Sequence, residues 1–136
     1  MKIAFISSDT KQAIDAKNKL IELYGDTPIE DAKIIVALGG DGLMLQVLHK
    51  FITANIPIYG MNCGSIGFLM NELKFDGLYE KLENSEITEI NPLKMIVTDI
   101  QGSQFSEIAI NEVALSRTTH QAAKLQISIN NTVRLN

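Results

Sequence analysis

The stretch Lys33–Leu48 reads KIIVALGGDGLMLQVL, and its order of residue types decides the fold of the first half of the chain. The unbroken apolar run Ile34–Leu38 is typical of a strand that is covered on both faces. Three glycines and one carboxylate follow in Gly39–Gly42, and an apolar helical segment begins at once. We therefore predict a strand, a tight turn and a helix start, a geometry that presents backbone N–H groups to an anion.

The segments on either side continue the same alternation of strand and helix. Short apolar runs are typical of buried strands, and apolar residues three or four apart are typical of helices. The predicted order is a strand at Ile3–Ile6, a helix that Asp9 or Thr10 caps and Gly25 ends, the strand Ile34–Leu38, a buried helix after Gly42 that is apolar on most sides, a strand at Ile58–Met61, and a helix carrying Phe75, Leu78, Tyr79 and Leu82. This alternation predicts an α/β unit with a parallel sheet.

After about Glu86 the pattern changes to apolar residues that alternate with polar ones. This alternation is typical of half-buried antiparallel strands, and we find it at Leu93, Met95 and Val97 and again at Leu125, Ile127 and Ile129. Asn130-Asn131 suits a two-residue hairpin turn, because Asn tolerates positive φ. We place a boundary within residues 84–92, with an α/β unit at 1–88 and an all-β unit at 89–136.

The all-β unit looks incomplete as a folding unit. Roughly 50 residues of strands would form a poor sheet with open edges. We therefore expect the chain to be the N-terminal portion of a longer protein.

Composition and charge exclude several classes of protein. The 136 residues are 46% hydrophobic and 21% charged, as in an ordinary globular domain. A net charge of −4 without a basic run argues against nucleic-acid binding. The single cysteine, Cys63, excludes an internal disulfide and a Cys-rich zinc site. No apolar stretch is long enough to span a membrane and no signal peptide is evident, so we expect a cytoplasmic protein without membrane association.

The glycine turn is the first candidate site. Asp41 lies at the carboxyl end of a predicted buried strand, where open α/β sheets bind ligands. A carboxylate there can accept the proton of a suitably placed hydroxyl. The alternative is an Asp that merely caps a helix, but three glycines around one Asp favour a functional turn. The pattern is neither the dinucleotide G-x-G-x-x-G nor a Walker A loop.

A second candidate is the loop Asn62–Leu69, which follows the third predicted strand and should lie at the same sheet edge. Asn62 can donate and accept hydrogen bonds, Gly64 and Gly67 keep the loop low, and Phe68 could stack on a ring. The alternative is an ordinary turn with a buried Phe.

A third candidate is Asn111-Glu112, where the strand alternation slips by one residue. A slip predicts a bulge or bend, and such features re-aim side chains beside sites. An amide beside a carboxylate suits ribose hydroxyls or a base edge. The alternative is a strand end with two solvated polar residues.

Taken together and in this order, the three motifs resemble those of the NAD kinases. The hallmarks of that family are a G-G-D-G turn, an N-x-G-x-x-G-F loop and an N-E pair, here Gly39–Gly42, Asn62–Phe68 and Asn111-Glu112. The resemblance implies a Rossmann-like N-terminal domain, related to the phosphofructokinase and diacylglycerol-kinase folds, followed by the first strands of an all-β sandwich domain. Leu43 departs from the family pattern, which usually has Thr there, and the downstream G-D-G and T-P-x-G-S-T-A-Y motifs do not occur.

The resemblance also implies an activity. It is the transfer of a phosphoryl group from ATP or another donor to the adenosine-ribose 2′-hydroxyl of NAD, with Mg²⁺ or another divalent ion on the donor phosphates and Asp41 as general base. It implies nucleotide contacts from Gly39, Gly40, Gly42, Asn62, Gly64, Phe68, Asn111 and Glu112. It further implies small-molecule nucleotides as partners and a homo-oligomer, dimer or tetramer, for the complete chain. A nucleotide-binding fragment without turnover, and a lipid or sugar kinase with the same turn, remain alternatives.

Overall fold

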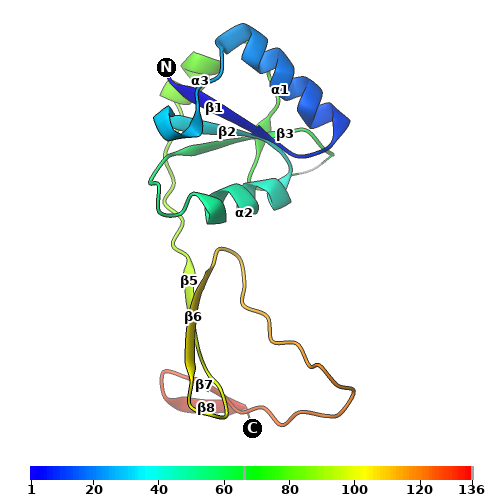
Figure 1. The fold of residues 1–136 in the computed structure, drawn as a ribbon, viewed down its shortest axis with the longest axis vertical. Helices are drawn as coiled ribbons and strands as arrows, with labels where there is room; N and C mark the ends of the chain where they lie inside the picture. The colour runs from blue at the N-terminus through cyan, green and yellow to red at the C-terminus, as the bar shows by residue number, and fades with distance from the viewer. Residues whose placement is uncertain (66, 136) are drawn as a thin grey trace.

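The computed structural model describes residues 1–65 and 67–135, and its first half is a parallel sheet with helices on both faces (Figure 1). The sheet order is β1-β2-β3-β4, with every neighbouring pair parallel. The strands are β1 Ile3–Ser7, β2 Ile34–Gly39, β3 Ile58–Asn62 and β4 Asn71–Glu72. The helices are α1 Lys11–Tyr24, the 3₁₀ helix η1 Ile29–Asp31, α2 Asp41–Lys50 and α3 Leu78–Glu83. The predicted α/β unit is therefore confirmed, and β4 is a short addition to it.

Helix α1 begins and ends where the sequence indicates. Thr10 rather than Asp9 is the N-cap, and its Oγ1 accepts a hydrogen bond of 3.3 Å from the Ala13 N–H. Gly25 ends the helix with φ 75°, a conformation that favours glycine. Its N–H donates to the Ile21 carbonyl at 2.8 Å. These two residues set the start and the end of α1, the helix that connects β1 to β2.

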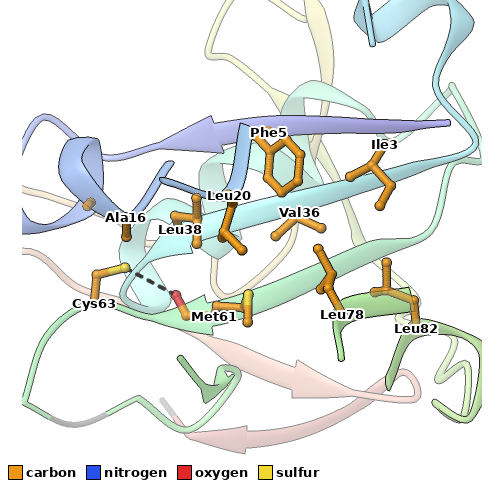
Figure 2. Packing of buried hydrophobic residues seen from close by; sticks show 11 residues of the cluster. Ile3, Phe5, Ala16, Leu20, Val36, Leu38, Met61, Cys63, Leu78 and Leu82 are labelled. Carbon is orange, nitrogen blue, oxygen red and sulfur yellow. Dashed lines mark hydrogen bonds between the residues drawn. The ribbon is translucent and has the colours of Figure 1, made fainter. Parts of the chain in front are cut away.

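Strand β2 is buried on both faces, as its unbroken apolar run predicts. Val36 and Leu38 belong to the larger core cluster, beneath α1 and α3, whereas Ile35 and Ala37 belong to a second cluster on the α2 side. Figure 2 shows how side chains from β1, β2, β3, α1 and α3 meet in the larger cluster. Core packing on both faces of the sheet thus fixes the end of β2, where Gly39 lies.

Two of the predicted helices differ in extent or burial. Only Met44 and Val47 of α2 are buried, because a helix can turn only one stripe toward a sheet, and its other apolar side chains are half-buried. Phe75 lies before α3 rather than within it. Gly77 adopts a left-handed conformation, φ 68°, and α3 starts only after it, at Leu78.

The second half contains two separate antiparallel pairs. Strand β5, Leu93–Thr98, pairs with β6, Gln104–Ala109, and β7, Ile127–Ile129, pairs with β8, Thr132–Leu135. The hairpin turn at Asn130-Asn131 is confirmed, with φ of 49° and 63°. The strand side chains are mostly exposed instead of half-buried, because no second layer among the described residues covers a two-stranded sheet.

Strand boundaries in this half also correct the sequence-based prediction. Leu125 precedes β7 and is not part of it. Strand β6 ends at Ala109, Ile110-Asn111 forms the predicted bend, and the segment 112–117 is not a strand. The change of alternation at Asn111 therefore marks the end of a strand and not a bulge within one.

Candidate functional site

The register of the sheet brings the first two motifs together. Gly39, the last residue of β2, pairs with Asn62, the last residue of β3. The ladder extends one step further, where the Cys63 N–H donates to the Gly39 carbonyl at 2.8 Å. The glycine turn and the Asn62–Leu69 loop therefore start side by side at one edge of the sheet, as predicted.

The Asp41 carboxylate joins the two motifs directly. Its Oδ2 accepts a hydrogen bond from the Phe68 N–H and its Oδ1 accepts one from the Leu69 N–H, both at 2.9 Å. The N-cap of α2 is Gly40 and Asp41 is the first residue of the helix, so the alternative in which Asp41 is the N-cap is wrong. An ionised carboxylate offers about four lone-pair positions, so it retains acceptor capacity for a ligand hydroxyl.

The helix start adds a favourable field at the same place. Asp41 is the first residue of α2 and is only partly buried. Negative charge is stabilised in the first turn of a helix, by about 0.3–1 kcal/mol at exposed positions. The start of α2 therefore offers a favourable field to the negative charge of the Asp41 side chain.

The three glycines of the turn differ in what the fold requires of them. A Cβ on Gly39 would lie 2.8 Å from Leu43 Cδ2 and 3.1 Å from Leu43 Cβ, so a side chain there would crowd Leu43 and glycine fits the packing best. A Cβ on Gly40 or Gly42 would meet none of the described residues within 4 Å. Gly40 is also extended, with φ −122°, which any residue adopts. Gly40 and Gly42 therefore leave the backbone bare on both sides of Asp41, although the packing would accept a side chain at either position.

Leu43, where the motif resemblance would place a Thr, has a packing role. Its side chain is partly buried against the α2-side cluster and lies close to Gly39. A partly buried apolar contact thus stands where a Thr would offer a hydroxyl.

The second motif has a defined shape and an exposed ring. Asn62 Oδ1 accepts a hydrogen bond of 2.9 Å from the Gly64 N–H, which folds the loop back at its start. The Phe68 side chain is 92% exposed, so the alternative of a turn with a buried Phe is wrong. An exposed ring with its backbone pinned is suited to stacking. Ile66, within the same motif, lies outside the described residues.

The structure does not join the third motif to the other two. Asn111 and Glu112 are both exposed, and the Asn111 side-chain amide donates to the Glu112 carboxylate. Among residues 1–65 and 67–135, no hydrogen bond links this pair to the glycine turn. Its assignment to nucleotide binding stays a prediction.

The residues of the same region offer little basis for thiol or metal chemistry. Burial raises the pKa of the Cys63 thiol, which keeps the sulfur protonated and unreactive. In the part of the chain that the structure describes, no three His, Cys, Asp or Glu side chains are grouped to hold a metal ion. No helix of that part is both long and apolar enough to cross a bilayer.

Sequence reasoning did not foresee the contacts that two residues of the loop make with Asp41. Leu69 contributes only its backbone N–H, which any residue other than Pro would supply and which leaves no mark in the sequence. Gly67 lies so close that a Cβ on it would be 3.2 Å from Asp41 Oδ1. The glycine itself was the available signal, but its partner could be found only from the structure.

Comparison with known proteins agrees with this geometry. Residues 4–90 match the model of the ATP-NAD kinase N-terminal domain. A protein of Caulobacter vibrioides named NAD kinase is 50% identical over 134 residues, which is 98% of this chain and 52% of that protein. A protein of Brucella suis with the same name is 46% identical over 135 residues, 99% of this chain and 52% of that protein.

A more distant relative gives the same result. The NAD kinase of Xanthomonas campestris is 42% identical over 136 residues, which is 98% of this chain and 53% of that protein. The chain thus spans about half the length of the curated relatives it matches. With its glycine turn, its Asn62–Phe68 loop and these matches, the chain belongs to the ATP-NAD kinase family.

Proposed function

We propose that the protein carrying this chain phosphorylates NAD, transferring a phosphoryl group from ATP or another donor to the adenosine-ribose 2′-hydroxyl to give NADP. The observation that carries the proposal is the bare backbone at Gly40 and Gly42, which the fold does not require and which flanks the Asp41 carboxylate. Phosphate groups need close approach to backbone N–H groups, and a side chain at either position would obstruct it.

Asp41 is the proposed general base. A group in this role must lie within hydrogen-bond reach of the proton that it removes. The carboxylate faces the sheet edge where ligands of open α/β folds bind, and its two loop hydrogen bonds hold it in one orientation. Because it retains acceptor positions, it can accept a ribose hydroxyl without leaving the loop.

The neighbouring residues would bind the nucleotide. Gly39, Gly40 and Gly42 would seat phosphate groups, and the exposed Phe68 ring would line the pocket near the adenine. Of the Asn62 side chain, Oδ1 is engaged with Gly64, whereas its amide nitrogen makes no hydrogen bond with the described residues and can donate to a ligand. Asn111 and Glu112 would bind polar groups of the nucleotide from the second half of the chain.

Phosphoryl transfer depends on positioning and charge neutralisation more than on covalent help from the protein. A divalent ion such as Mg²⁺ typically binds substrate phosphates together with one or two carboxylates. The residues at this edge fit that pattern, since they supply one carboxylate, Asp41, and no protein cage. The ion would neutralise charge on the donor, while this chain's residues orient the acceptor hydroxyl.

The wider assignment follows from the family. We propose that residues 1–88 form a Rossmann-like domain of the phosphofructokinase and diacylglycerol-kinase type. We propose that residues 89–136 begin a β-sandwich, and the exposed apolar side chains of β5–β8 support a further layer over them. A homo-oligomer in the cytoplasm is the proposed working state.

The relatives, which carry the name NAD kinase, do not favour the alternative of binding without turnover, but it can be tested on these 136 residues alone. Among the described residues, no hydrogen bond joins the Asn111-Glu112 pair to the glycine turn. A coupled assay of NADP formation, run beside calorimetry with NAD, separates the two cases. Binding with turnover supports the kinase proposal for the chain itself, and binding without turnover supports the fragment. A substrate panel of lipids and sugars tests the remaining alternative, since phosphorylation of those instead of NAD would refute the proposal.

A further inference from the structure

Among the described residues, the Asp41 side chain provides the hydrogen bonds that hold the segment Gly67–Leu69 to α2. The Phe68 and Leu69 N–H groups each donate 2.9 Å hydrogen bonds to different oxygens of Asp41. Phe68 itself is 92% exposed, so its ring does not hold the segment in place. The carboxylate is therefore the visible polar link between this segment and the glycine turn.

Close packing of the backbone makes this arrangement possible. A Cβ on Gly67 would lie 3.2 Å from Asp41 Oδ1 and 3.0 Å and 3.1 Å from Met70 Cγ and Cβ. These Met70 atoms are near its backbone and cannot swing away as a side-chain tip can. A side chain at residue 67 therefore requires a shift of a few tenths of an ångström between the segment, Met70 and the carboxylate, which disturbs the hydrogen-bond geometry at Asp41.

We propose that Gly67 is a positioning residue for Asp41, and that the Asp41 carboxylate both receives the substrate proton and anchors the segment that presents Phe68. The anchor, meaning the two hydrogen bonds from Phe68 and Leu69 to Asp41, follows from the contacts above. Its role in catalysis rests on the proposed function. Orientation of the base and placement of the stacking ring are thus coupled through one carboxylate. Disturbing the anchor changes both, whereas removing the ring changes only one.

Amide hydrogen exchange measures the anchor without substrate. In the chain as it stands, we expect the Phe68 and Leu69 amides to be protected. The variant Gly67→Ala should exchange both roughly ten- to a hundredfold faster, the range expected when hydrogen bonds to a charged group are lost. Gly64→Ala is the matched control, because its Cβ would be 3.5 Å from Asn62 Oδ1, an ordinary contact. It should leave exchange at Phe68 and Leu69 unchanged.

A second variant, Asp41→Asn, tests the anchor independently in case Gly67→Ala does not fold. Asp41→Asn keeps one carbonyl acceptor and replaces the other oxygen with a donor, so one of the two amides should lose protection. Amides of β2 serve as the folding control in every variant. Unchanged protection at both Phe68 and Leu69 in Asp41→Asn would overturn the anchor, whatever the behaviour of Gly67→Ala.

Kinetics of the complete protein test the coupling. Phe68→Ala should raise KM for NAD with little change in kcat, because it removes ring contacts and keeps the backbone N–H. Gly67→Ala should lower kcat as well, by about tenfold or more, because the base loses its orientation. A Gly67→Ala enzyme that changes only KM would refute the positioning role while leaving the proposed function intact. Absence of NADP formation in the unmodified complete protein would refute the function and leave the exchange result standing.

Discussion

The substitution Gly42→Ala should stabilise the protein and impair its function. Gly42 lies in the first turn of α2, and within 4 Å a Cβ there would meet no atom of residues 1–65 or 67–135. Glycine in a helix costs about 0.5–1 kcal/mol relative to alanine, so the variant should gain up to that amount. For a chain of this size the gain corresponds to a rise in Tm of roughly 2–5 °C.

Nucleotide binding by the same variant should fall. If phosphate groups approach the backbone of the turn, an added methyl group lies in their path, and a loss of about 1.4 kcal/mol is tenfold in affinity. Thermal unfolding and calorimetry with NAD measure the two effects on one sample. Gly39→Ala is the matched contrast, since its Cβ would collide with Leu43 Cδ2 at 2.8 Å and should destabilise by about 1–3 kcal/mol. A Gly42→Ala variant that binds NAD like the unmodified chain would refute the assignment of the bare backbone to a ligand.

Three other substitutions test the site and its support. Asp41→Asn in the complete protein should abolish NADP formation in a coupled assay but weaken NAD binding in calorimetry no more than Phe68→Ala does, because one of the two loop hydrogen bonds remains, and near-normal turnover would exclude the general-base role. Leu20→Ala removes a fully buried side chain between α1 and the sheet and should cost about 2–5 kcal/mol in urea unfolding; a loss under 1 kcal/mol would contradict the packing. Tyr24→Phe removes the hydroxyl that donates to the Phe75 carbonyl at 2.7 Å and accepts from the Leu78 N–H at 3.3 Å, so it should cost about 1–2 kcal/mol in the same measurement, and an unchanged midpoint would count against this link.

The first half of the fold could be predicted because local signals and the core agree there. The Thr10 cap, the Gly25 stop and the apolar run of β2 each act within a few residues, and tertiary packing reinforces them. The parallel arrangement then places Gly39 beside Asn62 without further information. The place where the glycine turn and the Asn62–Leu69 loop meet could therefore be predicted from the sequence.

The contacts within the site could not be predicted in the same way. The bonds from Phe68 and Leu69 to Asp41 use backbone donors, which carry no residue identity. The exposure of Phe68 also runs against the tendency of large apolar side chains to be buried. Polarity patterns predicted half-buried strands in the second half, but burial requires a covering layer that alternation alone cannot provide.

The most direct test is a titration of this chain with NAD, followed by amide NMR. The account predicts that saturating NAD shifts the amide signals of Gly40, Gly42, Phe68 and Leu69, because the ligand lies between the glycine turn and the Phe68 ring. If those four signals stay in place while amides elsewhere move, the dinucleotide does not bind at the Asp41 turn, and the central claim is wrong.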